Sequence, residues 1–423
     1  MSSSASESRT PILDLESPLP KKLRLDRLSW RQALLIVGLP FVGFFLIDIF
    51  AVVLIDSNPA AASIFGYIAT KFDNLFNGYG SRSPLLLFFS YFLTLFVVIA
   101  IHELGHVAGG LAVGFHFQRV RIGPLTLAKS SQGVRFSFQR ISEFDGIALM
   151  RTQKLQKLRQ KFAIYIAAGP CANLFSALCL WPLLASQLFD TLPHAIRQSL
   201  QVLAALSIFV ASVNLIPYRR RNGMFTDGYR LLSFVTSKVK TRRLLSILAL
   251  KMQTHSGVRL RDLKRTWIAH SCTIPDQSVD ALQAFWIAYL ADNDRKDAER
   301  AAQNLEKCME RFEIASVELQ KLLLMEAAIF QAWFRNDEQK AKCWSQKSET
   351  YPAAPLLNRL RLTICLHWAG RRYDELSSAW KKGCIHIEAL PASPAKGRLM
   401  DGWLEWKNEI DAKRAARETQ QQS

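Results

Sequence analysis

His102, Glu103 and His106 form a short motif, His-Glu-Leu-Gly-His, near the end of a long apolar run over residues 84–115. On an α-helix, residues four positions apart project from one face, so the two imidazoles can bind one Zn²⁺ ion. Glu103, next to the first histidine, then lies within reach of a water molecule at the metal and can act as its base. The pattern predicts metal-assisted hydrolysis.

The sequence that precedes the motif has the composition of a membrane-spanning helix. Between residues 85 and 101 the only polar side chains are those of Ser90, Tyr91 and Thr94. An ionisable group at mid-bilayer costs about 3 kcal/mol unless it faces a cavity, a metal or another such group. Three of them on one apolar helix therefore indicate a functional site within the membrane.

Four apolar segments are long enough to span a bilayer, and we expect them at about 33–55, 85–115, 162–185 and 199–217. Basic residues flank these segments in the N-terminal stretch, in the loop 116–161 and in Arg219 to Arg221, so these parts should be cytoplasmic. Both chain termini then lie in the cytoplasm. This topology accounts for the net charge of +19, so the lipid bilayer and not a nucleic acid is the expected partner.

The loop 116–161 contains a hairpin signal. Polar and apolar residues alternate on both sides of a turn at residues 130–133, which predicts a small β-hairpin. Its edge around Val134 to Phe138 offers a place for an extended peptide. In the preceding span, Gly105 and Gly109 are small residues of the kind that let a second helix approach closely.

The second half of the chain is charged and has no apolar run of spanning length. Three segments there repeat a helix, a polar turn and a second helix, and the turns fall near Asn293, Asn336 and Gly370. This repetition is typical of tetratricopeptide-like repeats, and an irregular helical bundle is the alternative. We expect this half to bind a protein partner or the cytosolic part of a substrate.

Three ordered motifs resemble the site-2 protease family of intramembrane zinc metalloproteases. They are the His-Glu-Leu-Gly-His motif, the Gly169-Pro170-x-x-Asn173 element, and Asn214-x-x-Pro217 followed by Asp227-Gly228. The resemblance covers roughly residues 84–230. It implies a zinc metalloendopeptidase that cleaves the transmembrane segments of membrane-protein substrates, with Glu103 as the catalytic base and His102, His106 and Asp227 as the zinc ligands.

The third ligand is open at this stage. Nine residues separate Pro217 from Asp227, a longer spacing than is usual in the family, and Asp145 in the basic loop is the alternative ligand. Asn173 and Asn214 are candidates for binding the substrate. The competing function is a non-proteolytic zinc-binding membrane scaffold or sensor that acts through its helical C-terminal half.

The expected fold is an α-helical multi-pass membrane protein, with a four-span zinc metalloprotease core, a small β-hairpin and a soluble all-α, tetratricopeptide-like C-terminal domain. No cleavable signal peptide precedes the first apolar run, so we expect the cytoplasmic membrane of a bacterium. The expected segments are a disordered cytoplasmic tail (1–28), the membrane-embedded metalloprotease domain (29–235), linker helices (236–275), the helical repeat-like domain (276–410) and a disordered C-terminal tail (411–423).

Overall fold

The computed structural model describes residue 13 and residues 84–130, 133–138, 146–152, 156–186, 191–192, 194–390 and 394–422. The chain divides into two compact units, and the boundary falls within helix α8 (Lys238–His255). The unit called here the sheet unit comprises Arg24–Arg220 and Phe225–Thr241. The second, the helical unit, comprises Met1–Leu23, Arg221–Met224 and Arg242–Ser423.

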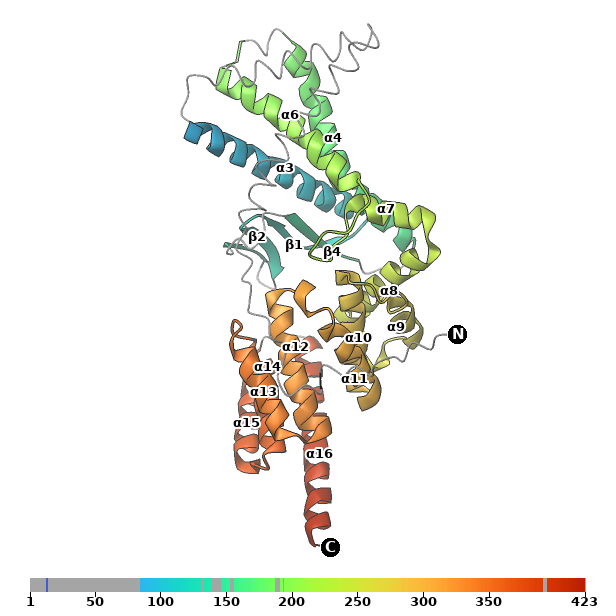
Figure 1. Ribbon diagram of the computed structural model, residues 1–423, viewed down its shortest axis with the longest axis vertical. Helices are drawn as coiled ribbons and strands as arrows, with labels where there is room; N and C mark the ends of the chain where they lie inside the picture. Colours follow the sequence, from blue (N-terminus) through green and yellow to red (C-terminus); the bar gives the residue numbers. More distant parts are fainter. Residues whose placement is uncertain are drawn as a thin grey trace, which may run out of the picture. The chain divides into compact units, whose positions relative to one another are not determined.

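Three long helices form the apolar part of the sheet unit. They are α3 (Pro84–Ala112), α4 (Leu158–Ala185) and α6 (His194–Leu215), and each of them packs against the other two (Figure 1). Gly105 and Gly109 of α3 face Ala168 and Ala172 of α4, where a Cβ on either glycine would lie about 2.3 to 2.5 Å from an alanine Cβ. The small residues thus allow the close approach of the two helices that the sequence predicts.

Helix α4 continues through Pro170 and Pro182, both of which lie inside it. The Gly169-Pro170 element therefore belongs to one continuous helix. Proline removes one backbone donor, and a helix tolerates this loss where its neighbours pack closely around it.

Two of the described helices are long and apolar enough to cross a membrane, Tyr91–Ala112 and Leu158–Leu184. The expected fourth span corresponds to a shorter apolar helix, Ser199–Leu215, and the expected first span at 33–55 lies outside the described residues. The four-span arrangement stays a prediction.

The β-structure is larger than the expected hairpin. Four antiparallel strands pair in the order β3-β2-β1-β4, where the strands are β1 (His116–Ile122), β2 (Leu125–Ser130), β3 (Gly133–Phe138) and β4 (Gly146–Arg151). The predicted turn joins β2 to β3, with Ser130 opposite Gly133. One face of the sheet buries Val120, Ile122 and Ala148 against α3, which brings the sheet onto the helix that carries the His-Glu-Leu-Gly-His motif.

A short loop follows α6 and leads into α7 (Asp227–Thr236). Arg219 and Phe225 form an antiparallel bridge, and the Thr226 hydroxyl donates to the carbonyl of Ile216 at 2.7 Å. Thr226 also caps α7, because its side chain accepts a hydrogen bond from the Tyr229 N–H. The loop between Ile216 and Asp227 therefore begins and ends at nearly the same place.

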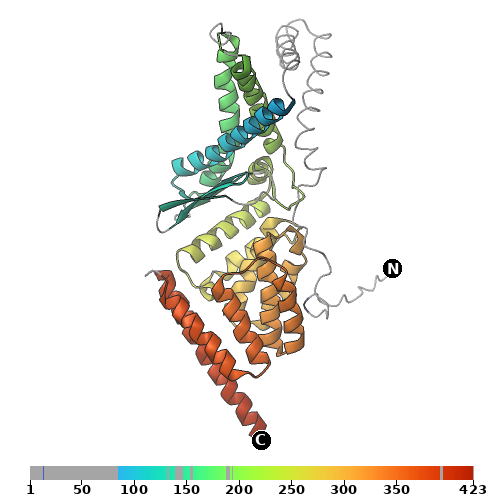
Figure 2. The same ribbon diagram turned by 90° about the vertical axis from the view of Figure 1, so that its left-hand side faces the viewer.

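Three helix pairs form most of the helical unit (Figure 2). They are α10 (Val279–Asp294) with α11 (Ala298–Met309), α12 (Val317–Phe330) with α13 (Glu338–Glu349), and α14 (Leu356–Ala369) with α15 (Tyr373–Glu388). Each pair is joined by a turn with one residue in the left-handed region, namely Lys296, Asn336 and Arg371. The three repeated segments predicted from the sequence are thus three equivalent helix pairs, and their assignment as tetratricopeptide-like repeats stays a prediction.

Shorter elements complete this unit. Helix η2 (Leu260–Asp262) and α9 (Arg265–Ser271) precede the pairs, and η3 (Phe312–Ile314) and the π-helical turn η4 (Gln331–Arg335) flank α12. Helix α16 (Pro394–Gln422) is the last element. This helix includes residues 411–422, for which the sequence predicts a disordered tail.

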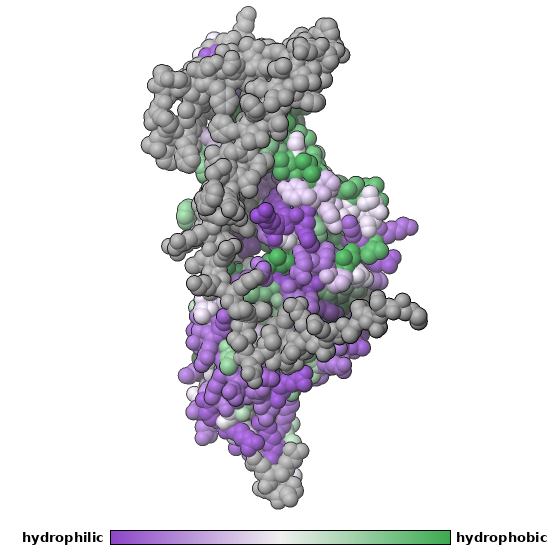
Figure 3. Space-filling model, in the orientation of Figure 1, coloured by the Kyte–Doolittle hydropathy of each residue, from purple (hydrophilic) through white to green (hydrophobic). Residues whose placement is uncertain are grey.

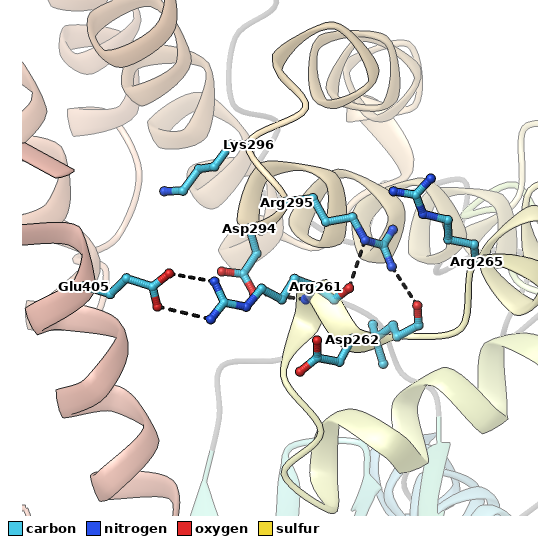
Figure 4. Close-up of a pocket in the computed structure, with 8 residues that line it drawn as sticks. Arg261, Asp262, Arg265, Asp294, Arg295, Lys296 and Glu405 are labelled. Atoms are coloured by element: carbon cyan, nitrogen blue, oxygen red, sulfur yellow. Dashed lines mark hydrogen bonds and ion pairs between the residues drawn. The ribbon is translucent and has the colours of Figure 1, made fainter. Parts of the chain in front are cut away.

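Glu405 ties α16 to η2 within the helical unit. Its carboxylate accepts hydrogen bonds from Arg261 at 2.6 and 3.3 Å, while Arg295 donates to the carbonyls of Arg261 and Leu263 (Figure 4). The charged groups lining this surface pocket thus pair largely with one another. On the face drawn in Figure 3, hydrophobic side chains gather on the described surface of the sheet unit, whereas the helical unit is mostly hydrophilic.

Candidate metal centre

Three potential metal ligands converge in the sheet unit. His102 Nε2 lies 3.1 Å from Asp227 Oδ2, His106 Nε2 lies 3.5 Å from the same oxygen, and the two histidine nitrogens are 3.2 Å apart. Ligand atoms about 2.0–2.1 Å from a tetrahedral zinc ion are separated by roughly 3.3 Å. The three side chains therefore have the spacing of three corners of a zinc tetrahedron.

Asp227 joins the histidines despite its long spacing from Pro217. Because the bridge between Arg219 and Phe225 closes the intervening loop on itself, the extra residues do not carry Asp227 away from the end of α6. Gly228 packs so tightly there that a Cβ on it would lie 1.8 Å from the Leu215 carbonyl oxygen. The alternative ligand, Asp145, lies outside the described residues.

Hydrogen bonds hold the histidine nitrogens in the orientation that a metal needs. His106 Nδ1 lies 2.9 Å from the carbonyl oxygen of Tyr165, so it carries the proton and donates it to that oxygen. The Nε2 atom of His106 therefore presents a lone pair to Asp227 and His102, as a zinc ligand must.

Asn173 contacts the other histidine. Its side-chain amide lies 3.4 Å from His102 Nδ1, and its Oδ1 is buried and has no hydrogen-bond partner among the described residues. Rotating the amide by half a turn lets the His102 Nδ1–H donate to Oδ1, which satisfies both groups and leaves Nε2 free for a metal. Asn173 is fully buried beside His102, and its contact with a substrate stays a prediction.

Asn214 is also engaged within the protein. Its Nδ2 donates to the Val210 carbonyl at 3.0 Å, and its Oδ1 accepts from Arg220 at 2.8 Å. These bonds anchor the end of α6 and the start of the loop that leads to Asp227. As for Asn173, its contact with a substrate stays a prediction.

The site is buried but contains charge. His102, Glu103 and His106 are each at most 7% exposed. Asp227 Oδ2 faces the Nε2 atoms of both histidines. An aspartate is ordinarily a carboxylate at neutral pH, which is the form that binds a cation.

Glu103 lies against the first residue of β4. A Cβ built on Gly146 would be 2.3 Å from Glu103 Oε1, so a larger residue at this position would require Glu103 or the strand to shift. The Tyr165 hydroxyl donates to the Ala148 carbonyl at 2.6 Å and fixes the same strand to α4. The sheet edge that begins beside Glu103 is therefore β4, and the expected edge at Val134 to Phe138 is β3, on the opposite side of the sheet.

Gly169 makes room for the second histidine. A Cβ at this position would lie 2.3 Å from His106 Nε2. The sequence alone did not identify Gly146 or Tyr165 as parts of the site, because their roles depend on contacts between elements. Gly169 belongs to the Gly169-Pro170-x-x-Asn173 element found in the sequence, and the structure shows that a glycine there makes room for His106.

Residues 90–198 match the model of peptidase family M50. The matched segment is about a quarter of the chain. The family expected from the sequence, that of the site-2 proteases, is thereby confirmed, and the M50 match includes His102, Glu103, His106 and Asn173. Neither the curated proteins nor the solved structures gave a match to the chain.

The M50 match supports a metallopeptidase. It ends at residue 198, before Asn214 and Asp227. The position of Asp227 beside the two histidines therefore rests on the geometry of the site alone.

Proposed function

We propose that this M50 protein is an intramembrane zinc metalloprotease, which hydrolyses peptide bonds in or near the transmembrane segments of membrane-protein substrates. The observation that carries the proposal is the triangle of His102, His106 and Asp227, with distances of 3.1, 3.2 and 3.5 Å between ligand atoms, on and beside an apolar helix. A structural zinc site needs four protein ligands. Three converging ligands beside a carboxylate are typical of a catalytic one.

Each residue has a defined task in this mechanism. A Zn²⁺ ion bound by His102, His106 and Asp227 would supply Lewis acidity to the scissile carbonyl and to water. Glu103 accepts the proton of the attacking water and passes it to the leaving amine. Tyr165 and Asn173 keep the two imidazoles in the tautomer that turns Nε2 towards the ligand triangle.

The β4 strand supports the proposal by offering a place for the substrate. A helical substrate must unwind before its carbonyl can be attacked, because that carbonyl is hydrogen-bonded within the helix. Strand β4 lies at the end of the sheet order, so its outer backbone groups can pair with an added strand. Since β4 begins beside Glu103, an unwound segment on this edge runs towards the base.

The same proposal includes a location. We place the protein in the cytoplasmic membrane of a bacterium as a multi-pass protein with cytoplasmic termini, because basic residues flank its apolar segments. The helical unit then faces the cytoplasm, where it meets a protein partner or the soluble part of a substrate.

The zinc content of detergent-purified protein tests the metal site. We expect about one zinc per chain in the parent, as for a single catalytic site. We expect loss of that zinc in Asp227→Ala and its retention in Asp145→Ala. Retention of zinc in Asp227→Ala would overturn the ligand assignment.

Cleavage of single-span reporter proteins tests the reaction. Glu103→Gln should keep its zinc and lose cleavage, since the amide cannot accept the proton of water. Glu299→Gln, the same change at an exposed position of α11, is the matched control and should cleave normally. A zinc-containing Glu103→Gln protein with parental cleavage would favour the scaffold or sensor function.

A further inference from the structure

Leu13 is buried in the helical unit although it comes from the N-terminal end of the chain. Its exposed fraction is 3%, and it belongs to the hydrophobic cluster formed by the helix pairs, with members such as Leu305 of α11 and Leu324 of α12. In sequence it lies some 290 residues or more from the side chains that hold its backbone. Leu13 thus belongs to a hydrophobic core formed by residues that are far from it in sequence.

Both main-chain polar groups of Leu13 are bound by side chains. The Leu13 N–H donates to Glu306 Oε2 at 3.1 Å, and its carbonyl accepts from Gln331 Nε2 at 2.6 Å. Glu306 lies on α11, and Gln331 begins the π-helical turn η4 that follows α12. Two side chains on different helix pairs therefore hold one residue of a peptide by its backbone and bury its side chain.

The π-helical turn supports a binding role for Gln331. Gln331 is 1% exposed, and its own carbonyl accepts the Asp337 N–H at 3.0 Å, which closes the turn between α12 and α13. The side-chain amide is thus directed to Leu13 by the wider turn. Such π-turns are rare and occur frequently at functional sites, and a buried amide without its partner is costly.

We propose that the helical unit contains a peptide-binding site for a short segment with a leucine side chain, and that the N-terminal segment around Leu13 is its occupant in this protein. Glu306 and Gln331 recognise the backbone, and the hydrophobic cluster recognises the leucine. In this protein the site holds Leu13 on the helical unit. A leucine-bearing segment of another protein competes for the same site.

A fluorescein-labelled peptide with the sequence of residues 8–18 tests the proposal on full-length protein in detergent. In Leu13→Asp protein the site is free, because burying an unpaired carboxylate is unfavourable. The parent carries its own tethered segment at a high effective concentration, so we expect at least tenfold weaker peptide binding to the parent, as an order of magnitude. A peptide with the Leu13→Asp change should not bind to either protein.

A second pair of variants tests the backbone contact in the Leu13→Asp background. Gln331→Met preserves side-chain length but removes the donor, and we expect about tenfold weaker binding of the peptide. Gln320→Met is the matched control. Gln320 Nε2 donates to the Phe312 carbonyl at 2.9 Å, a bond of the same kind elsewhere in the helical unit, so its loss should leave peptide binding unchanged.

Three results would overturn the proposal. Equal binding of the peptide to parent and Leu13→Asp protein would put the peptide elsewhere. If the peptide does not bind to a Leu13→Asp protein that has the parental helix content and melting temperature, then Leu13 does not act as a ligand of this site. An unfolded Leu13→Asp protein would make Leu13 part of the core, because a ligand can leave a stable domain.

Discussion

The contact between Gly146 and Glu103 predicts a variant that damages hydrolysis without removing the metal. In Gly146→Ala, the new Cβ would lie 2.3 Å from Glu103 Oε1, 2.4 Å from Cγ and 2.6 Å from Cδ. Non-bonded carbon atoms prefer separations of about 3.5–4.0 Å. Strand β4 or the Glu103 side chain must therefore shift by roughly 1 Å to remove the overlap.

A shift of this size has a calculable effect on the rate. A displacement of about 1 Å in a reacting group can cost about 100-fold in rate, because positioning supplies much of the catalysis. We expect kcat for a reporter substrate to fall by about this factor. The zinc content should stay at the parental value, since the three atoms nearest to the new methyl group all belong to Glu103 and not to a ligand.

The assay compares cleavage of a reporter whose processing requires Glu103, together with zinc measured on the same preparation. Gly402→Ala is the matched control, because a Cβ at Gly402 meets nothing within 4 Å. Parental kcat in Gly146→Ala would refute the placement of β4 against the base. Loss of zinc along with activity would show that the substitution acts on the ligands and not on Glu103.

Three other predictions concern the ligands, the thiols and an ion pair. Gly169→Ala should lower zinc content, because its Cβ would lie 2.3 Å from His106 Nε2. Cys308 and Cys365 should resist iodoacetamide at pH 8 until the protein is denatured, since burial raises the pKa of both thiols, that of Cys365 to about 12. Hydrogen bonds from arginine lower the pKa of Glu405, so its contribution to stability is present at neutral pH and is lost as the pH falls through the folded-state pKa.

Each of these predictions has its own measurement. Zinc per chain, with Gly402→Ala as control, checks the Gly169 variant, and a parental value would contradict the proposed role of that glycine. Peptide mass spectrometry of alkylated protein checks the thiols, with the partly exposed Cys343 of α13 as the reference for faster reaction. The melting temperatures of parent and Glu405→Gln should differ at pH 7 and converge towards about pH 3, so a constant difference would speak against the ion pair.

Local patterns predicted much of the fold. The apolar runs predicted the helices α3, α4 and α6 to within a few residues of most of their ends, because a membrane-type helix needs an unbroken apolar stretch. The hairpin turn at residues 130–133 followed from alternation and glycine. The three helix pairs followed from repeated turn sequences, each of which ends one helix and starts the next.

Other features escaped prediction because they depend on contacts over a distance. The strands β1 and β4 extend the expected hairpin to a four-stranded sheet. The composition of these strands does not indicate which strands they pair with. Helix α16 reaches Gln422, and pairs of opposite charge four residues apart, such as Arg414 and Glu418, support a helix in this charged stretch. Leu13 stands in a polar segment, and its burial comes from two helices distant in sequence.

By itself, the sequence determined the pair of histidines and the neighbouring glutamate, since a helical repeat of 3.6 residues suffices to put positions four apart on one face. Only the tertiary structure brought Asp227, 125 residues from His102, to that face. Only it showed that the loop before Asp227 closes on itself, that Gly146 and Gly169 leave room for Glu103 and His106, and that Tyr165 orients an imidazole. The physical reason is that periodicity acts within one element, whereas a metal site needs distances between several elements.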